Sequence, residues 1–499
     1  MDLLNEYKEK NKELEYLAHA VALMNYEMET IAPDKGKAKL ADSIAFFSTK
    51  RFEKATSDEF YDRVCKLSEP SEFDKLDDVY KYDVSRTKED LDKLRRVPAD
   101  FFAEHVKTVT ASAIAWPKAK QNNDFASFEK PLSETIETTK KINAYTDPDK
   151  AVYDALIDGF EKGMTIEKID KAFGELKKEL VPLLDKILSC PQPDHEKFTM
   201  TVPVHEQEKL SDFLLDYIGI DKDAFCQAQT EHPFTESMSI TDVRIANHYY
   251  ENEVLSAIFS TIHEGGHALY EQNVDLKYEG TQGAVLNYMG LHESQSRFFE
   301  NILGRNINFW KPIWPDVVKI VPEFESITLE DFYREINHVK NSYIRTEADE
   351  LTYCLHVILR YEVEKSIFID GVEVKDLPAL WNSKMEELLH ITPRNDAEGV
   401  LQDSHWSNAQ FGYFPSYLLG NIYDGMFLET MEKELGSIDD ILSAGNIKDI
   451  TKWLNENIHR YGSTRTSGEV LAAVCGTDEL SAQPIIKYFK DKYSRIYEL

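Results

Sequence analysis

Two histidines and a glutamate near the middle of the chain have the spacing of a metal site. The segment reads His263-Glu264-Gly265-Gly266-His267, and residues four apart lie on one face of a helix. Both imidazoles can therefore reach one point, and neutral imidazole nitrogens suit Zn²⁺. A carboxylate beside the first histidine can accept a proton from metal-activated water and pass it to a leaving amine. The pattern predicts a hydrolytic metal centre with Glu264 as its general base.

A third ligand is needed, because a catalytic zinc ion takes three protein ligands and keeps one position open. The chain offers His292 and Glu293, the latter 26 residues beyond His267. Adjacent helical residues point about 100° apart, so only one of the two can face the metal. We select Glu293 on a second helix, and the alternative is a surface carboxylate. Two histidines and a glutamate also accept Co²⁺ or Mn²⁺ in place of Zn²⁺.

Two adjacent glycines interrupt the predicted metal helix. Gly265 and Gly266 each cost roughly 1 kcal/mol relative to alanine in a helix interior. One explanation is that a substrate or another backbone comes close to this face of the helix. The other is close packing of the helix against a neighbouring helix. The sequence leaves both explanations open.

A second tract rich in polar and aromatic side chains follows much later in the chain. It contains Gln402, Asp403, His405, Tyr413 and Tyr417. The histidine and the two tyrosine hydroxyls can donate hydrogen bonds to the oxyanion that forms when water attacks a peptide carbonyl. The alternative is an aromatic-rich turn of the hydrophobic core.

Helices are the elements expected to position these residues. Apolar residues recur at helical spacing over residues 3–29, 37–54, 73–94, 99–144 with a break at Pro117, 165–188 with Thr165 as N-cap, 329–365, 377–390 and 416–435. Two strands are expected at 198–202 and 239–245, and the second directly precedes the metal helix. A small sheet there would offer a peptide an edge to pair with. We therefore predict a mainly α fold, a single catalytic domain over 1–499, with lobes at 1–190 and 191–499.

Composition narrows the possible partners and the compartment. The 499 residues carry a formal net charge of −32, which argues against nucleic acid and anionic membranes as partners. The five cysteines are scattered, and neither a signal sequence nor an apolar run of about 18 residues is apparent. We expect a soluble protein of a reducing compartment, the cytoplasm.

Six ordered motifs resemble those of the Taq-type (thermostable carboxypeptidase 1) zinc metallocarboxypeptidases. They stand here as His232-Pro233-Phe234, Asp242-Val243-Arg244, His263-Glu264-Gly265-Gly266-His267, His292-Glu293-Ser294-Gln295, Ile344-Arg345-Thr346-Glu347-Ala348-Asp349, and a tract from Gly399 to Tyr417. The resemblance extends over nearly the whole chain. One departure is Ala246, which stands where the family often has threonine.

The resemblance implies a two-lobed helical metallopeptidase with a deep central groove, similar to neurolysin and angiotensin-converting enzyme, and usually a homodimer. It implies a metal held by His263, His267 and Glu293, with Glu264 as the base. It also implies release of C-terminal amino acids one at a time from peptides, with broad specificity. Two alternatives are an oligopeptidase that cuts internal bonds of short peptides and a non-catalytic helical scaffold.

An exopeptidase must recognise the terminal carboxylate of its substrate, and an arginine that binds both oxygens is the natural device. Arg345 is our first choice for this role and Arg244 the second, although either can instead form a structural ion pair. The expected substrate-binding residues are Arg345, Arg244, His232, Tyr417, Gln402 and Asp403.

Overall fold

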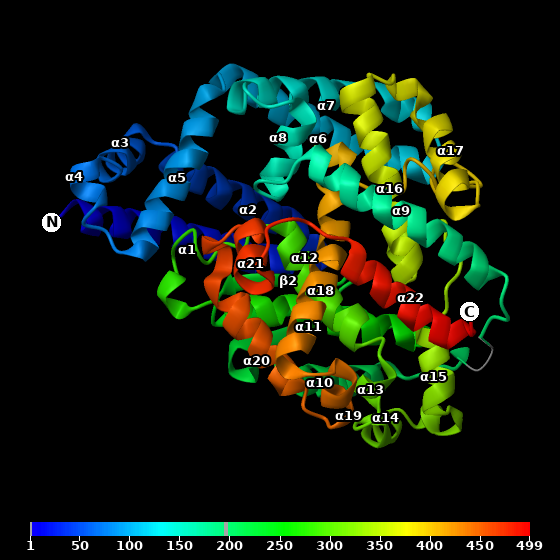
Figure 1. The fold of residues 1–499 in the computed structure, drawn as a ribbon. Helices are drawn as coiled ribbons and strands as arrows, with labels where there is room; N and C mark the ends of the chain where they lie inside the picture. The colour runs from blue at the N-terminus through cyan, green and yellow to red at the C-terminus, as the bar shows by residue number, and fades with distance from the viewer. Residues whose placement is uncertain (1, 194–197) are drawn as a thin grey trace.

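Helices dominate the fold, and one small sheet lies among them (Figure 1). The structure, a computed structural model, describes residues 2–193 and 198–499. The first group of helices is α1 (Leu3–Glu29), α2 (Asp34–Ala55), α3 (Asp58–Leu67), α4 (Pro70–Phe73), α5 (Asp78–Arg96), α6 (Ala99–Asn122), α7 (Phe125–Thr146), α8 (Val152–Phe160) and α9 (Ile166–Leu188). The mainly α fold class predicted from the sequence is confirmed.

The second group of helices carries the chemistry-bearing motifs. It comprises α10 (Val204–Ile218), α11 (Val254–Gln272), α12 (Met289–Arg297), α13 (Ile307–Trp310), α14 (Trp314–Ile320), α15 (Leu329–Ile336), α16 (Glu350–Lys365), α17 (Leu377–Leu389), α18 (Phe414–Leu435), α19 (Ile438–Ser443), α20 (Ile447–Asn457), α21 (Ser467–Cys475) and α22 (Gln483–Tyr497). None of the helices in the described part of the chain is long and apolar enough to cross a membrane.

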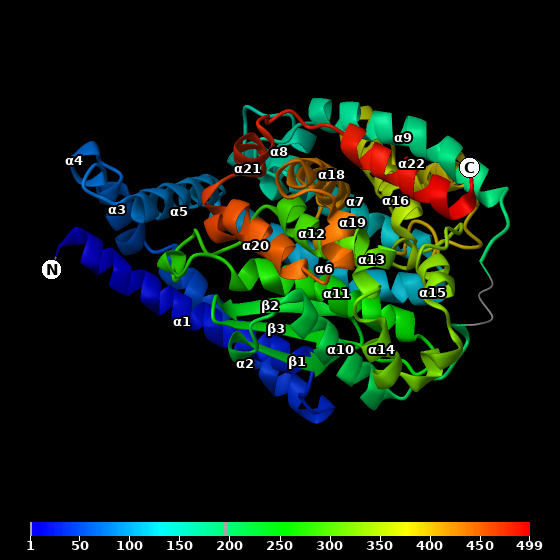
Figure 2. The same cartoon turned by 60° about the horizontal axis from the view of Figure 1, so that its bottom comes forward.

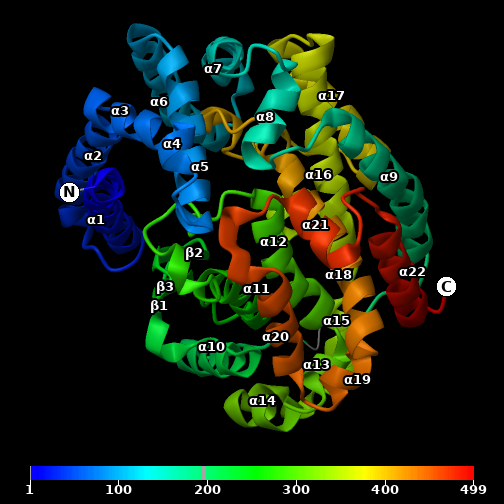
Figure 3. The same ribbon diagram turned by 60° about the vertical axis from the view of Figure 1, so that its left-hand side comes forward.

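The first five helices form an N-terminal arm, residues 3–96, beside the rest of the molecule (Figure 3). The arm has a small core of its own, to which Tyr7, Phe60 and Val84 contribute. Helix α2 contributes no buried residue to it. The much larger main core extends from Ala119 to Tyr497 and surrounds α11, α12, α16 and α18. The predicted division into lobes at residue 190 stays a prediction.

The sheet lies between the arm and the metal helix (Figure 2). Its strands β1 (Phe225–Gln229), β2 (Phe234–Ser239) and β3 (Asp242–Asn247) have the order β1-β3-β2. Strand β3 pairs in parallel with β1 and antiparallel with β2. Since successive side chains of a strand point to opposite faces, β3 presents Val243 and Ile245 to the main core and Ala246 to the arm.

The two glycines of the metal helix are explained by close helix packing. A methyl group at Gly265 would lie 2.6 Å from Ile218 Cδ1 of α10, and one at Gly266 would lie 2.6 Å from the Gln295 carbonyl oxygen of α12. At Gly266 the neighbour is backbone, which excludes a side chain, whereas at Gly265 the end of the Ile218 side chain would have to move. Helix α11 therefore packs directly on α10 and α12, and this approach brings the two motif-bearing helices α11 and α12 together.

Three expectations about local structure are wrong, each for a physical reason. Helix α6 continues through Pro117 and ends at Asn122, because the next residue, Asn123, adopts a left-handed φ of 50° and so terminates the helix. Residues 198–202 form no strand. Phe198 and Val202 are buried in the main core, and this burial accounts for the apolar pattern that suggested a strand. The helix expected over 329–365 is interrupted between α15 and α16, where Asp349 caps α16 by accepting from the backbone N–H groups of Leu351 and Thr352.

Other expected elements agree with the structure. Helices α1, α17 and α18 have nearly the bounds that apolar spacing predicts, and Thr165 caps α9 by accepting from the Lys168 backbone N–H. A small sheet does lie beside the metal helix. The interruption between α15 and α16 is the segment that carries Arg345.

Candidate active site

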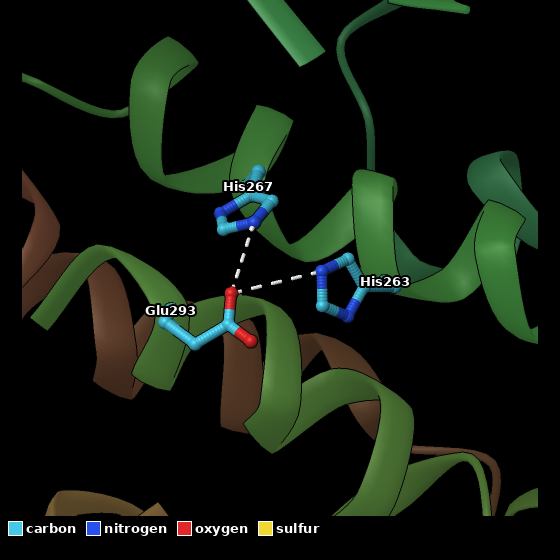
Figure 4. Close-up of side chains that lie close together, drawn as sticks. All are labelled: His263, His267 and Glu293. Carbon is cyan, nitrogen blue, oxygen red and sulfur yellow. Dashed lines mark ion pairs between the residues drawn. The ribbon is translucent and has the colours of Figure 1, made fainter. Parts of the chain in front are cut away.

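The two motif-bearing helices bring His263, His267 and Glu293 together (Figure 4). Both histidines lie on one face of α11, and Glu293 points to them from α12. Glu293 Oε2 lies 3.8 Å from His263 Nε2 and 3.6 Å from His267 Nε2. These separations are too long for hydrogen bonds. Three ligand atoms therefore face one point without being bonded to one another.

This arrangement fits a divalent metal ion. Two ligands that are each about 2.1 Å from a tetrahedral Zn²⁺ lie about 3.4 Å apart, which is close to the separations between these atoms. Burial lowers the pKa of His267 to about 3, so its imidazole is neutral, as a metal ligand must be. Burial alone would raise the pKa of Glu293, but Arg297 and the two histidines hold it well below the usual range. The carboxylate is therefore ionised.

A second layer of ion pairs holds the ligands in place. His263 Nδ1 lies 2.9 Å from Glu300 Oε2, while Arg297 donates from Nε to Glu293 Oε1 at 2.8 Å and from Nη1 to Glu300 Oε2 at 3.2 Å. Arg305 also lies 3.3 Å from Glu300. Such partners fix the orientation of a ligating imidazole or carboxylate. We call His263, Glu264, His267, Glu293, Arg297, Glu300 and Arg305 together the metal cluster.

A stretch of π-helix supplies Glu300. Residues Phe298–Leu303 directly continue α12 with π-helical hydrogen bonding. π-Bulges are often found at functional sites, because the wider turn redirects a side chain. Here the segment follows the helix that carries Glu293, and its Glu300 reaches His263 of the neighbouring helix. One continuous helical element thus provides one candidate ligand and supports another.

His292, the alternative to Glu293, is used differently. Its ring stacks on that of His267 with centroids 4.3 Å apart, and its Nε2 lies 3.0 Å from Glu271 Oε1. The side chain is thereby held against the flank of His267. Of the two adjacent residues, it is Glu293 whose carboxylate faces both imidazole Nε2 atoms.

The carboxylate of Glu264 is fixed by a residue of the sheet. Thr235 of β2 donates from its hydroxyl to Glu264 Oε2 at 2.6 Å. Thr235 pairs with Ile245 across the sheet and therefore shares the face that points to the metal helix. Burial raises the pKa of Glu264, although its neighbour His263 and the Thr235 hydroxyl lower it. A base with a raised pKa is suited to taking and returning a proton near neutral pH.

A second group of buried charges surrounds Arg345. Its guanidinium donates to Asp403 Oδ1 from Nε at 3.2 Å and from Nη2 at 3.0 Å. Arg360 donates from Nε to Asp403 Oδ2 at 2.7 Å and from Nη2 to the Gln402 side-chain oxygen at 2.6 Å. We call Arg345, Arg360, Gln402 and Asp403 the arginine cluster. With two guanidiniums and one carboxylate, it carries a net positive charge.

The aromatic tract joins this cluster. Arg345 lies 4.7 Å from the centre of the Tyr417 ring, and His405 Nε2 lies 3.0 Å from the Tyr417 hydroxyl. The Tyr413 ring lies 5.1 Å from that of Tyr417. Burial lowers the pKa of His405 to about 4, and burial followed by the charge of Glu293 raises that of Tyr413 to about 12. Both groups are therefore neutral at pH 7, and the charge of Glu293 from the metal cluster acts on Tyr413.

Two of the predicted substrate-binding residues lie elsewhere. Arg244 donates to Asp242 from Nε and Nη2, both at 2.8 Å, and lies 5.5 Å from the centre of the Tyr26 ring of the arm. It occupies the face of β3 opposite Val243 and Ile245, away from α11. His232 is exposed in the bend before β2. The sequence thus names ten residues that the structure gathers around the two clusters and two that it does not.

Several residues in the two clusters or in contact with them are missed by sequence reasoning. Arg297 stands four positions after Glu293 and could have been found from that helical spacing. Thr235, Glu300 and Arg360 give no such signal, because their partners are distant in sequence or require a π-helical turn.

Comparison with known proteins adds an independent line of evidence. The family model described as Carboxypeptidase Taq (M32) metallopeptidase matches residues 6–493. Carboxypeptidase 1 of Bacillus subtilis (strain 168) is 40% identical over 496 residues, covering 99% of this chain and 98% of that protein. Thermostable carboxypeptidase 1 of Thermus thermophilus is 33% identical over 500 residues, with 98% of each chain covered. The crystal structure of M32 carboxypeptidase from Deinococcus radiodurans R1 has a TM-score of 0.95 at 31% identity, with 100% of each chain covered.

Proposed function

The chain belongs to the Taq-type (M32) carboxypeptidases and is a metal-dependent carboxypeptidase, and we propose that its two charged clusters divide the work of the reaction. The metal cluster hydrolyses the last peptide bond, and the arginine cluster recognises the C-terminal carboxylate beyond it. The observation that carries this division is the opposite charge balance of the two clusters, in which three carboxylates face two arginines in one and two arginines face one carboxylate in the other.

His263, His267 and Glu293 would hold the metal, and Zn²⁺ is the ion that suits them, with Co²⁺ or Mn²⁺ as substitutes. When bound, the metal supplies Lewis-acid activation of water and of the scissile carbonyl. The carboxylate of Glu264, which Thr235 orients, takes a proton from the attacking water and returns it to the leaving amine. His405 and Tyr413 lie on the side of the arginine cluster and donate to the developing oxyanion.

Arg345 is the better of the two candidate carboxylate receptors. Its contacts with Asp403 and with one further acceptor use three of the guanidinium's five N–H groups. Two remain for a substrate carboxylate, which can bind both oxygens to one guanidinium. Asp403 holds this guanidinium, Gln402 accepts from the Arg345 backbone N–H, Arg360 binds the other oxygen of Asp403, and Tyr417 covers the guanidinium face. Arg244, by contrast, is saturated on one edge by Asp242 and lies on the arm side of the sheet.

The partners and the compartment are also part of the proposal. Peptides are the substrates, taken with broad specificity, and the net charge of −32 disfavours nucleic acid. A homodimer is expected from the family resemblance. A reducing, cytoplasmic location is supported by five cysteines that are all free thiols in the described chain.

A comparison of Arg345→Ala with Arg244→Ala tests the division of work. Each variant is assayed on one peptide with a free and with an amidated C-terminus. We expect Arg345→Ala to raise the KM for the free peptide and to reduce the preference for it, with metal content unchanged. Arg244→Ala should keep the preference. If Arg244→Ala lost the preference and Arg345→Ala kept it, Arg244 of the sheet would be the residue that binds the C-terminal carboxylate. Equal effects of both variants would show that Arg345 has no special role in binding it.

A further inference from the structure

One tyrosine contacts an arginine of each cluster. Tyr353 of α16 is 3% exposed. The guanidinium of Arg297 from the metal cluster lies 3.9 Å from the centre of its ring. Arg345 from the arginine cluster donates from Nη1 to its hydroxyl at 3.0 Å. The ring face and the hydroxyl of a single side chain therefore serve two different clusters.

These contacts complete a chain of side chains between the two clusters. Glu293 accepts from Arg297, Arg297 packs on Tyr353, Tyr353 accepts from Arg345, and Arg345 pairs with Asp403. Glu293, Arg345 and Tyr353 are buried, and the side chains of Arg297 and Asp403 are 12% exposed. A tyrosine ring is rigid and has two side-chain torsions, which makes it a spacer of fixed length.

The distance between the clusters decides which bond is cut. A carboxypeptidase must bind the terminal carboxylate one residue beyond the scissile carbonyl, and one residue spans about 3.3–3.6 Å. A misplacement of about 1 Å in a bound group can cost about a hundredfold in rate. The carboxylate receptor therefore has to be fixed relative to the metal ligands, which stand on α11 and α12, whereas Arg345 stands in the segment before α16.

We propose that Tyr353 is a positioning residue that holds Arg345 at the distance from the metal cluster which one C-terminal residue spans, and so restricts cleavage to single residues. The inference rests on the proposed role of Arg345. Tyr353 acts through Arg345 on one side and through Arg297 on the other. Its hydroxyl needs to stay a neutral acceptor for Arg345, and burial, which raises the pKa of Tyr353, keeps the phenol protonated.

The variant Tyr353→Phe removes the hydroxyl and keeps the ring that faces Arg297. We expect the KM for a free-carboxylate peptide to rise about tenfold, the size expected for a lost hydrogen bond to a charged group. The preference over the amidated peptide should fall by a similar factor, while kcat and metal content change little. Tyr361→Phe is the matched control, because Tyr361 is also a buried tyrosine of α16 whose hydroxyl donates to Asp170, outside both clusters.

A double-mutant cycle separates positioning from a general structural effect. If Tyr353 acts through Arg345, then Tyr353→Phe changes neither KM nor the preference in an Arg345→Ala background. Additive effects in the double variant would overturn the inference, as would a Tyr353→Phe enzyme with the wild-type preference. If Arg345→Ala itself keeps the preference, the proposed role of Arg345 fails and this inference fails with it. If only Tyr353→Phe keeps the wild-type preference, the role of Tyr353 is wrong. If Arg345→Ala keeps it, the role of Arg345 is wrong.

The contact with the metal cluster has its own test. Tyr353→Leu also removes the ring, so Arg297 loses the surface that fixes it against Glu293. We expect metal affinity to fall about tenfold in this variant, within the range for residues that support a metal ligand, and to stay unchanged in Tyr353→Phe. Equal metal affinity in Tyr353→Leu and Tyr353→Phe would overturn the metal side of the proposal.

Discussion

The metal cluster and the arginine cluster are built from the same kinds of ion pair but differ in stoichiometry. The metal cluster sets three carboxylates, from Glu264, Glu293 and Glu300, against two arginines. The arginine cluster sets two guanidiniums against the carboxylate of Asp403. The metal cluster therefore has an excess negative charge that favours a cation, and the arginine cluster has an excess positive charge that favours an anion. Burial makes this balance effective, because exposed charges would be screened.

The comparison also shows how buried charges can be selective without being stabilising. A buried ion pair often contributes little net stability, since desolvation offsets the attraction. Both clusters nonetheless persist in nearly dry surroundings. Under the proposed division of work, the unpaired charge of each cluster binds a ligand, and the ion pairs fix the position of that charge.

Removal of a carboxylate from the metal cluster should have the largest effect. Glu293→Ala deletes a candidate ligand and leaves two histidines. We expect metal affinity to fall by more than the 10–100-fold typical of a supporting residue, as measured by metal content after dialysis against a chelator. An unchanged metal content would show that Glu293 is not the third ligand.

A smaller loss is expected when charge is removed without loss of shape. Glu300→Gln keeps an acceptor for His263 Nδ1 but removes the negative charge. We expect metal affinity to fall about 10–100-fold. Glu362→Gln is the control, because Glu362 pairs with Lys177 and Lys384 away from both clusters. If Glu300→Gln binds the metal as tightly as the wild type, the π-helical segment does not support metal binding.

An uncharged substitution should separate turnover from metal binding. Thr235→Val keeps the shape of the side chain but no longer donates to Glu264. We expect kcat to fall about tenfold, as for loss of one hydrogen bond to a charged group, with metal content intact. Thr235→Ser should restore turnover because it restores the hydroxyl. If the serine variant is as slow as the valine variant, packing on β2 and not the hydrogen bond is responsible.

A buried carboxylate outside both clusters should affect stability alone. Asp83 of the arm accepts from the Tyr7 hydroxyl and the Gln282 backbone N–H, and burial raises its pKa to about 6. The folded state then binds more protons than the unfolded state between about pH 4 and 6, so stability falls as pH rises through this window and is level above it.

Asp83→Asn removes this dependence. Relative to the variant, the wild type should lose up to about 3 kcal/mol of unfolding free energy between pH 4 and 7, as followed by urea unfolding. Turnover and metal content should stay as in the wild type. A parallel pH profile for both proteins would show that Asp83 titrates normally.

Short-range patterns in the sequence predict much of the fold and the core of the site. The four-residue spacing of His263 and His267 predicts their shared helical face, and apolar periodicity predicts α1, α17 and α18. The contribution of Thr235 and the bridge through Tyr353 depend on which elements pack together, which local spacing does not encode. The same limit left the role of the paired glycines open until α10 and α12 were found against them.

Proline and apolar patterns misled where tertiary structure overrides local preference. Pro117 is accommodated inside α6, and the buried Phe198 and Val202 do not lie in a strand. The helix expected over 329–365 ends early at Ile336, and the interruption lets Arg345 reach Asp403. In that last case the failure of the local pattern coincides with the position of the proposed carboxylate receptor.

The most direct test of the two-cluster account is a mass-spectrometric time course on one peptide of about ten residues. The metal-loaded wild-type enzyme is given the free and the amidated form side by side. We expect a ladder that loses one residue at a time from the free form, and little cleavage of the amidated form. Equal shortening of both forms, or internal cuts in both, would contradict recognition of the terminal carboxylate by the arginine cluster.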